Sequence, residues 1–400
     1  MRFFASTAKG LEGLLAEELR AFGAAAVEPT RAGVAFEGGL EVGYRSCLWS
    51  RVASRILLPL GSFEARTPEQ LYAGVHAIAW ARHIPPRRTL AVDGSSVQSA
   101  IAHSHYAALK TKDAIVDRVR AARRTRPDVD VEQPDVRINL HLHRDRATLS
   151  IDLSGESQHR RGYRARRAPA PLKETLAAGV LLLSDWPRRA AAREPFLDPM
   201  CGSGTLAVEA AMMAGDVAPG LRRQHIGSAG WSGHDAALWK CLRDEAIERA
   251  RAVARLRSPI LGYDADPGAV RAAEQSAARA GLHGRVQFAT RQLTDCVPPQ
   301  GLAAGVIVTN PPYGIRLGRE AALGDVYEQL GDVLRRRFLG WTAFVLTGSA
   351  PLAKRIGLRS ERRTPLWNGA IECRLLEFPI SAEPVRKGAG PRWRAAAHRD

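Results

Sequence analysis

The sequence predicts an α/β protein with a mostly parallel sheet in its C-terminal half and smaller α+β units before it. From Leu172 onward, segments with helical periodicity alternate with short apolar strands, the pattern of a sheet whose parallel strands are joined by helices. Residues 195–198 form an apolar strand that runs through glycines directly into a helix, which is typical of ligand-binding α/β domains. We therefore expect two α+β units followed by one larger α/β domain.

Residues 1–54 predict the first α+β unit. Leucines at helical spacing predict a helix over Lys9–Phe22, and a second helix is expected over Leu40–Trp49. Short apolar runs near Val27 and at 34–36 are typical of strands. Nothing in this unit has the spacing of a catalytic site.

Residues 55–165 predict a second α+β unit. An amphipathic helix is expected over 113–120, followed by a basic run at 123–126. Two strands are expected at 136–142 and 148–153, joined by a polar turn.

Residues 166–380 predict the larger domain, and residues 381–400, rich in Arg, Pro, Gly and Ala, predict a disordered basic tail. The expected elements of the domain are helix 172–184, strand 195–198, helix 205–214, helix 238–256, strand 260–263, helix 267–280, strand 285–289, strand 305–309, helix 321–337, strand 342–346 and a closing pair of strands near 358–363 and 371–378.

The composition points to a polyanionic partner without proving one. The chain carries 58 basic and 41 acidic residues, a net charge of +17, and nucleic acid is the commonest partner of such proteins. However, 51 of the 58 basic residues are arginine, and alanine is abundant, as a GC-rich genome would produce. The charge therefore supports nucleic-acid binding but does not decide it.

Several classes of protein are disfavoured by what the sequence lacks. No apolar run approaches the ~20 residues of a membrane span, and the N-terminus has no apolar signal core. The five cysteines include no Cys-x-x-Cys pair. His141 and His143 share a strand face, but no further ligand stands at metal-binding spacing. We expect a cytoplasmic protein with no membrane segment and no metal.

The glycine-rich turn after the first strand of the larger domain predicts a cofactor site. It runs from Asp198 through Gly202 and Gly204 into a helix that starts at Thr205, so a ligand can approach bare backbone at the positive end of a helix. Asp198 can receive the methionyl ammonium of S-adenosylmethionine directly or through water. Asp264, which ends a later strand, can bind ribose hydroxyls.

A dehydrogenase is the competing interpretation, because Gly202, Gly204 and Ala207 satisfy the dinucleotide fingerprint. The ribose-binding acid of a dehydrogenase lies ~20 residues further on. Here the next acid that ends a strand, Asp264, follows Gly202 by 62 residues. The carboxylate of Asp198 would also repel a pyrophosphate, so we favour S-adenosylmethionine.

The tetrapeptide Asn310, Pro311, Pro312 and Tyr313 predicts a site for a planar amino group. Two prolines stiffen the loop and leave the carbonyls of Asn310 and Pro311 free, and Asn310 adds a side-chain oxygen. Tyr313 offers a flat ring on which a base can stack. A plain Pro-Pro turn is the alternative. The preceding Asn and following Tyr favour a nucleobase amine.

These motifs carry a family resemblance. The tetrapeptide resembles the Asn/Asp-Pro-Pro-Tyr/Phe signature of methyltransferases that act on nucleobase amino groups, and in order with Asp198–Thr205 and Gly262–Asp266 it is similar to class I methyltransferases. The segments that resemble the THUMP-containing methyltransferases are Ala5–Glu12, Lys112–Asp117, Arg161–Arg164 and Pro171–Glu174.

The resemblance implies a ferredoxin-like α+β unit, a THUMP domain that binds RNA, and a class I (Rossmann-like) methyltransferase domain. It further implies S-adenosylmethionine as cofactor, the ribosomal RNA of the large subunit as partner, and methylation of N2 of a guanine in 23S ribosomal RNA. Gln292 stands where related sequences tend to carry the carboxylate that meets the cofactor adenine, with Asp295 three residues on. Bifunctional relatives carry a second methyltransferase domain, which these 400 residues lack.

The most basic stretch of the chain, residues 158–167, predicts RNA contacts, because arginines interleaved with an aromatic ring can meet phosphates and stack on a base. A solvated linker is the alternative. The expected RNA-binding residues are Arg160, Arg161, Tyr163, Arg164, Arg166 and Arg167.

Other functions remain open at this point. The motifs also fit methylation of guanine N2 in transfer RNA or of adenine N6 in DNA, although the RNA-type N-terminal half weighs against DNA. A non-catalytic ribosome-assembly factor that binds RNA is the alternative from another class. The sequence does not reveal the oligomeric state.

Overall fold

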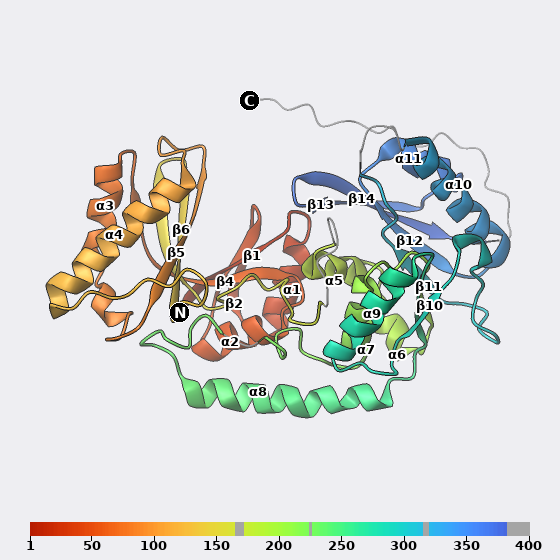
Figure 1. The fold of residues 1–400 in the computed structure, drawn as a ribbon, viewed down its shortest axis with the longest axis horizontal. Coiled ribbons are helices and arrows are strands. Elements are labelled where there is room, and N and C mark those ends of the chain that lie inside the picture. The colour runs from red at the N-terminus through yellow and green to blue at the C-terminus, as the bar shows by residue number, and fades with distance from the viewer. Residues whose placement is uncertain (165–171, 224–225, 315–319, 382–400) are drawn as a thin grey trace.

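The computed structural model describes residues 1–164, 172–223, 226–314 and 320–381, so the tail predicted at 381–400 lies outside the described residues except for its first residue. Two seven-stranded sheets form the two halves of the molecule (Figure 1). The first lies in the N-terminal half and has the order β2-β3-β1-β4-β7-β6-β5. The second has the order β10-β9-β8-β11-β12-β14-β13.

The first half of the N-terminal sheet is a β-α-β-β-α-β unit. Its helices confirm the two expected near residues 9–22 and 40–49, whereas the strands β1 and β4 were not predicted. The elements are β1 (Arg2–Thr7), α1 (Glu12–Ala21), β2 (Ala25–Thr30), β3 (Gly33–Glu37), α2 (Leu40–Trp49) and β4 (Ala53–Glu64).

The second half of this sheet continues without a break. Strand β4 pairs with β1 through Ala53–Leu57 and with β7 through Leu57–Glu64, so one long strand belongs to both halves. The boundary expected between residues 54 and 55 falls inside β4. The remaining elements are α3 (Pro68–Ala77), η1 (Trp80–Arg82), β5 (Leu90–Val97), α4 (Ser104–Arg123), β6 (Val136–His143) and β7 (Arg146–Asp152).

The C-terminal domain confirms the expected alternation of helix and strand. Its sheet is parallel except for β14, which runs antiparallel to β12 and β13. The elements are α5 (Glu174–Leu183), α6 (Trp186–Ala191), β8 (Phe196–Asp198), α7 (Thr205–Ala214), α8 (Ala236–Ala250), η2 (Arg251–Arg255), β9 (Ile260–Asp264), α9 (Pro267–Arg279), β10 (Gln287–Thr290), η3 (Leu293–Asp295), β11 (Val306–Thr309), α10 (Glu320–Arg337), β12 (Thr342–Thr347), α11 (Ala350–Arg355), β13 (Arg362–Asn368) and β14 (Ile371–Pro379).

One strand of this domain was expected too early in the chain, and two short helices were missed. The strand expected near 358–363 lies at 362–368, and the short helices α6 and α11 were not predicted. The position of β13 is set by its pairing with β14. Strand β14 in turn pairs with β12, which lies inside the sheet. Such long-range pairing overrides the weak local preference of a short segment.

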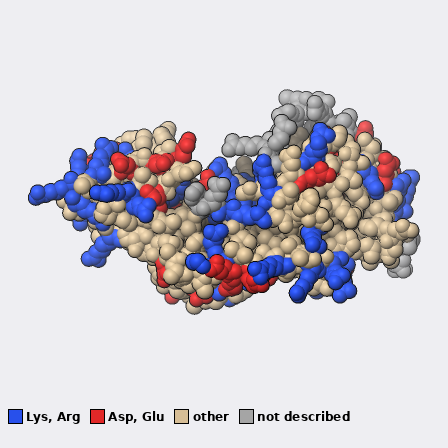
Figure 2. Space-filling model, turned by 60° about the horizontal axis from the view of Figure 1, so that its bottom comes forward, with Lys and Arg blue, Asp and Glu red and all other residues tan. Residues whose placement is uncertain are grey.

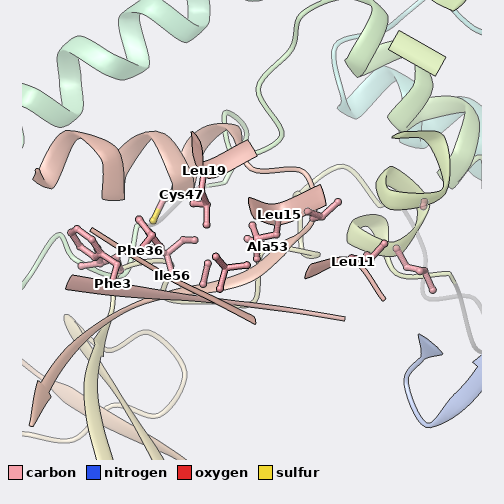
Figure 3. Close-up of a cluster of buried hydrophobic side chains, with 14 of the residues drawn as sticks. Phe3, Leu11, Leu15, Leu19, Phe36, Cys47, Ala53 and Ile56 are labelled. Carbon is pink, nitrogen blue, oxygen red and sulfur yellow. The ribbon is translucent and has the colours of Figure 1, made fainter. Parts of the chain in front are cut away.

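The two halves share a hydrophobic core. Figure 3 shows apolar side chains from α1, α2 and the neighbouring strands in one cluster, with Leu11 at the end nearest α5. A Cβ on Gly179 of α5 would lie 2.6 Å from Cδ2 of Leu11, so glycine at this position allows the close approach of the two elements. Helix α8 runs along one side of both halves (Figure 1).

Helix α8 also binds the N-terminal half through charged groups. Arg45 donates to both carboxylate oxygens of Glu245, at 2.9 and 2.8 Å, and the guanidinium of Arg249 lies 3.8 Å from the ring centre of Trp49. A planar, bidentate pair and a cation–π contact favour a single arrangement of the two elements. The contact between the two halves, which we call the seam, is therefore fixed by packing and by these polar contacts.

Candidate active site

The candidate site lies at the carboxyl ends of the central strands of the second sheet. Strand β8 lies between β9 and β11, so chain connections leave in opposite directions from this point. Open α/β sheets bind ligands in the crevice at such a position. Asp198 ends β8, Asp264 ends β9 and Asn310 follows β11, which brings the three predicted motifs to one edge.

The glycine-rich loop is held against β9 by its backbone. Cys201 donates its N–H to the carbonyl of Tyr263 at 2.8 Å, and Gly202 donates to Oδ2 of Asp264 at 2.8 Å. Gly202 and Gly204 have φ of 54° and 81°, which favour glycine. Asp264 therefore shapes the loop while its two carboxylate oxygens keep further lone pairs for a ligand.

The two glycines serve different purposes. A Cβ on Gly204 would lie 2.8 Å from Cβ of Ala273 in α9, so this glycine allows close packing of the loop on a helix. A Cβ on Gly202 would meet no described atom within 4 Å. Gly202 therefore leaves open space beside the loop into which a ligand can reach.

Asp198 is a buried carboxylate without a cationic partner among the described residues. It is 1% exposed, and it accepts hydrogen bonds from Oγ1 of Thr309 at 2.8 Å and from N of Met200 at 3.2 Å. Burial raises the pKa of the Asp198 carboxyl to about 7, and the nearby Asp264 carboxylate acts in the same direction. A bound cation would relieve this cost of ionisation.

Asn310 follows the residue that binds this carboxylate, and its side-chain oxygen is an acceptor without a described donor. It directly follows Thr309, whose hydroxyl holds Asp198. Its side-chain oxygen Oδ1 is buried and accepts no hydrogen bond from any described residue. Buried polar atoms are rarely left without a partner, and leaving one so costs roughly 1–3 kcal/mol. A ligand that donates an N–H at this point would satisfy it.

Tyr313 is half-buried and its ring is held by distant residues. The amide Nδ2 of Asn368 donates to the phenol oxygen at 3.0 Å, and the thiol of Cys373 lies 3.6 Å from the same oxygen. Burial raises the pKa of Tyr313. We did not predict Asn368 or Cys373, because they follow Tyr313 by 55 and 60 residues and carry no local motif.

The remaining site predictions lie nearby. Thr205 begins α7 and is 7% exposed, Pro311 is buried and Pro312 is exposed. The backbone N–H of Arg291 donates to the carbonyl of Asp264 at 2.9 Å. The exposed Gln292, which follows Arg291, therefore lies near the end of β9.

The basic stretch at 158–167 was interpreted wrongly for two of its residues. Arg161 and Tyr163 are each 2% exposed, so neither can meet RNA at the surface. The Tyr163 hydroxyl donates to Oε1 of Glu209 on α7 at 2.9 Å, and Nε of Arg161 lies 3.4 Å from the same oxygen. These side chains connect residues 161–163 to α7, the helix that follows the glycine-rich loop.

The other residues of the stretch differ among themselves. Arg160 is exposed and pairs with Glu156 at 3.0 Å. Arg164 is partly buried, pairs with Glu174 at 2.9 Å and donates to Oγ1 of Thr205 at 3.3 Å. Arg166 and Arg167 lie outside the described residues.

No helix within the described ranges has the length and apolar content needed to cross a membrane. In the same ranges, no group of three or more His, Cys, Asp or Glu side chains is arranged to hold a metal ion.

Three family models match consecutive parts of the chain. They describe an RlmL ferredoxin-like domain at residues 2–57, a THUMP domain at 65–152 and an RMKL-like methyltransferase domain at 161–377.

Curated relatives named ribosomal RNA large subunit methyltransferase K/L match almost the whole chain. Those of Syntrophotalea carbinolica and Methylococcus capsulatus are both 51% identical, over 96% and 95% of this chain and 54% and 51% of the relative. The chain thus spans about half the length of the curated relatives it matches.

Solved structures of methyltransferases match the chain over almost its whole length. The crystal structure of SMU.472, described as a methyltransferase and complexed with SAH, is 32% identical with a TM-score of 0.83, over 96% of this chain and 99% of that one. A Listeria monocytogenes protein described as an N6-adenine-specific DNA methylase is 31% identical with a TM-score of 0.80, over 94% and 95%. The chain therefore belongs to the RMKL-like methyltransferase domain family, a family dependent on S-adenosylmethionine, and carries an RlmL ferredoxin-like domain and a THUMP domain ahead of it.

Proposed function

We propose that this chain transfers the methyl group of S-adenosylmethionine to the exocyclic N2 of a guanine in 23S ribosomal RNA. The curated relatives are named for the RNA of the large ribosomal subunit, and the chain resembles them over all three domains. The observation that carries the proposal is the unsatisfied Oδ1 of Asn310, one residue from the hydroxyl that binds Asp198.

The residues around Asp198 fit S-adenosylmethionine. The buried carboxylate of Asp198 would take the methionyl ammonium, and Asp264 would take the ribose hydroxyls. Gly202 leaves space for the cofactor against the loop, which ends at the start of α7. Gln292 or Asp295 would meet the adenine amine. When bound, the sulfonium supplies an electrophilic methyl group.

The loop after β11 would present the target amine. An aromatic amine is a weak nucleophile because its lone pair is delocalised into the ring. If Oδ1 of Asn310 and the carbonyl of Pro311 accept its two N–H bonds, the nitrogen is drawn towards tetrahedral geometry and its lone pair is exposed. The same two oxygens stabilise the positive charge that develops on the nitrogen, and the methylated amine then becomes neutral by releasing one N–H proton to solvent. Stacking of the extruded base on Tyr313 adds roughly 1–3 kcal/mol.

We propose that RNA binds to the end of the molecule opposite the C-terminal domain. Figure 2 shows Lys and Arg crowded at this end, which α3, α4, β5 and β6 form in Figure 1. Arg87, Arg124 and Arg126 are exposed there. Arg123 of the same basic run is directed inward, where it donates to the carbonyls of Ala81 and Ile84.

The experiment is transfer of a tritiated methyl group from S-adenosylmethionine to unmethylated large-subunit ribosomal RNA, transfer RNA or DNA, with mapping of the labelled nucleoside. We expect N2-methylguanine in the ribosomal RNA alone. Label in adenine N6 of DNA or in transfer RNA would replace the proposed substrate, and no label in any acceptor would favour the non-catalytic assembly factor.

A variant tests the role of Asn310 in the same assay. Asn310→Ala should lower turnover by roughly 10²–10³, as removal of one preorganised polar partner does. S-adenosylhomocysteine affinity and thermal stability should remain as in the parent, because Oδ1 of Asn310 bonds to no described residue. Near-normal turnover would disprove the role.

A further inference from the structure

The ring of Tyr313 is reached by a hairpin from the far edge of the sheet. Asn368 ends β13 and Ile371 begins β14, and these two residues form the last pair of the hairpin before its turn. Gly369 in the turn has φ of 65°. The amide of Asn368 is therefore held at a fixed place, 3.0 Å from the phenol oxygen of Tyr313.

A second element restricts the same ring from the side. Gly348 follows β12, and a Cβ at this position would lie 2.9 Å from Cδ2 and 3.0 Å from Cε2 of Tyr313. The same Cβ would lie 2.9 Å from Cγ2 of Ile371, so a side chain at this position would have to displace the ring or the hairpin. The ring is thus held at its tip by Asn368 and along one edge by backbone.

The hairpin is itself fastened on two sides. Strand β14 pairs with β12 along six residues, and Nη2 of Arg362 in β13 donates to the carbonyl of Leu183 at 3.0 Å. Nζ of Lys9, from the N-terminal domain, lies 3.9 Å from the ring centre of Trp367, the residue before Asn368. A support held in this way has little freedom to shift when a ligand arrives.

We propose that Asn368 is a positioning residue that fixes the Tyr313 ring, before RNA binds, in the orientation in which an extruded guanine stacks on it. The inference rests on the proposed function, because it concerns the orientation of the ring on which the target guanine would stack. Catalytic geometry tolerates little error: a displacement of about 1 Å can reduce rate by 10²-fold. Asn368 acts through the phenol oxygen and touches no substrate.

A double-mutant cycle on single-turnover methyl transfer to unmethylated large-subunit ribosomal RNA tests this. Tyr313→Phe keeps the ring but removes the oxygen, and Asn368→Ala removes the donor. Each should lower the rate by a similar factor of roughly 10 to 10², and the double variant should lose no more than either single one. If the two factors multiply, or if Asn368→Ala transfers methyl at the parental rate, the inference is overturned.

Rescue distinguishes positioning from general damage. Asn368→Asp keeps the shape and can accept a hydrogen bond from the Tyr313 hydroxyl. It should therefore restore the rate of Asn368→Ala towards that of the parent, with S-adenosylhomocysteine affinity equal in all variants. Gly348→Ala should reproduce the loss, whereas Gly13→Ala, where a Cβ meets no described atom within 4 Å, should not. A Gly348→Ala variant as fast as the parent would contradict the role of position 348 in restricting the Tyr313 ring.

The structural readout does not depend on activity. In a crystal structure of Asn368→Ala, the Tyr313 ring should be displaced or spread over several orientations, and an unmoved ring would overturn the inference. Failure of the parent protein to methylate ribosomal RNA would reject the proposed function instead. The two failures are therefore distinguishable.

Discussion

Replacing Arg161 by methionine should destabilise the protein strongly, whereas the same change at the neighbouring Arg160 should not. Arg161 is 2% exposed, lies 3.4 Å from Glu209, and donates to the carbonyls of Arg51 at 2.5 Å and Ser50 at 3.5 Å. Arg161→Met leaves the carboxylate of Glu209 buried without that partner, and breaking a buried pair in this way costs about 3–5 kcal/mol.

Arg160 provides the matched control. Its pair with Glu156 has side chains that are 57% and 54% exposed, and exposed pairs contribute about 0–1 kcal/mol. Urea unfolding of the full chain measures both variants against the parent. Arg161→Met with Glu209→Gln should cost less than the sum of the two single changes, because the buried charges then disappear together.

RNA binding gives the result that would refute this reasoning. If Arg161 contacted a phosphate, Arg161→Met would unfold at the parental urea concentration and would reduce the slope of log affinity against log salt by about 0.7, the value for one phosphate of a single strand. We expect the opposite: a lower unfolding midpoint and, in the folded fraction, an unchanged salt slope. Parental stability with a reduced slope would restore the RNA-contact interpretation.

Three further predictions follow from the site and the basic end. We expect the ammonium group of the ligand to bind the ionised form of Asp198, whose pKa is about 7. The Kd for S-adenosylhomocysteine, measured by calorimetry, should therefore rise about tenfold per pH unit below 7 and level off above it. Asp198→Asn should remove this dependence. Gly202→Ala should weaken S-adenosylhomocysteine binding and cost roughly 1–2 kcal/mol of stability through its positive φ, whereas Gly204→Ala should cost more stability, because its Cβ would also lie 2.8 Å from Cβ of Ala273. Arg124→Gln with Arg126→Gln should reduce the salt slope of RNA binding by about 1.4 without moving the unfolding midpoint.

The sequence was most informative where a function is encoded in consecutive residues. Asp198, Asp264 and Asn310 each stand in a short motif at the end of a strand, and a parallel sheet brings such ends to one edge whatever lies between. Their convergence could therefore be predicted without knowing the side-chain contacts. The strands β1, β4 and β5 were not predicted, since the pairing of a strand depends on distant partners, and the helices α3, α6 and α11 were missed as well.

Partners supplied from far along the chain could not be predicted in this way. Counted within residues 158–167, the linker is basic with no acid, and it resembles an RNA-binding stretch. Its acid, Glu209, lies 46 residues after Tyr163 on the helix that follows the cofactor loop. Asn368 lies 55 residues after Tyr313. In both cases the sequence singled out the side chain but missed the group that determines its orientation.

These distant partners connect the N-terminal half to both sides of the candidate site. On the cofactor side, Arg164 of the linker donates to Thr205 at 3.3 Å, at the first residue of α7. On the target side, Lys9 lies over Trp367, next to the residue that holds Tyr313. Because a shared core also joins the halves, a change at the contact between them reaches the site through packed groups and not through the exposed surface proposed to bind RNA. Substitutions at the seam should therefore be interpreted first as changes in stability and site geometry, and only the exposed arginines as changes in RNA affinity.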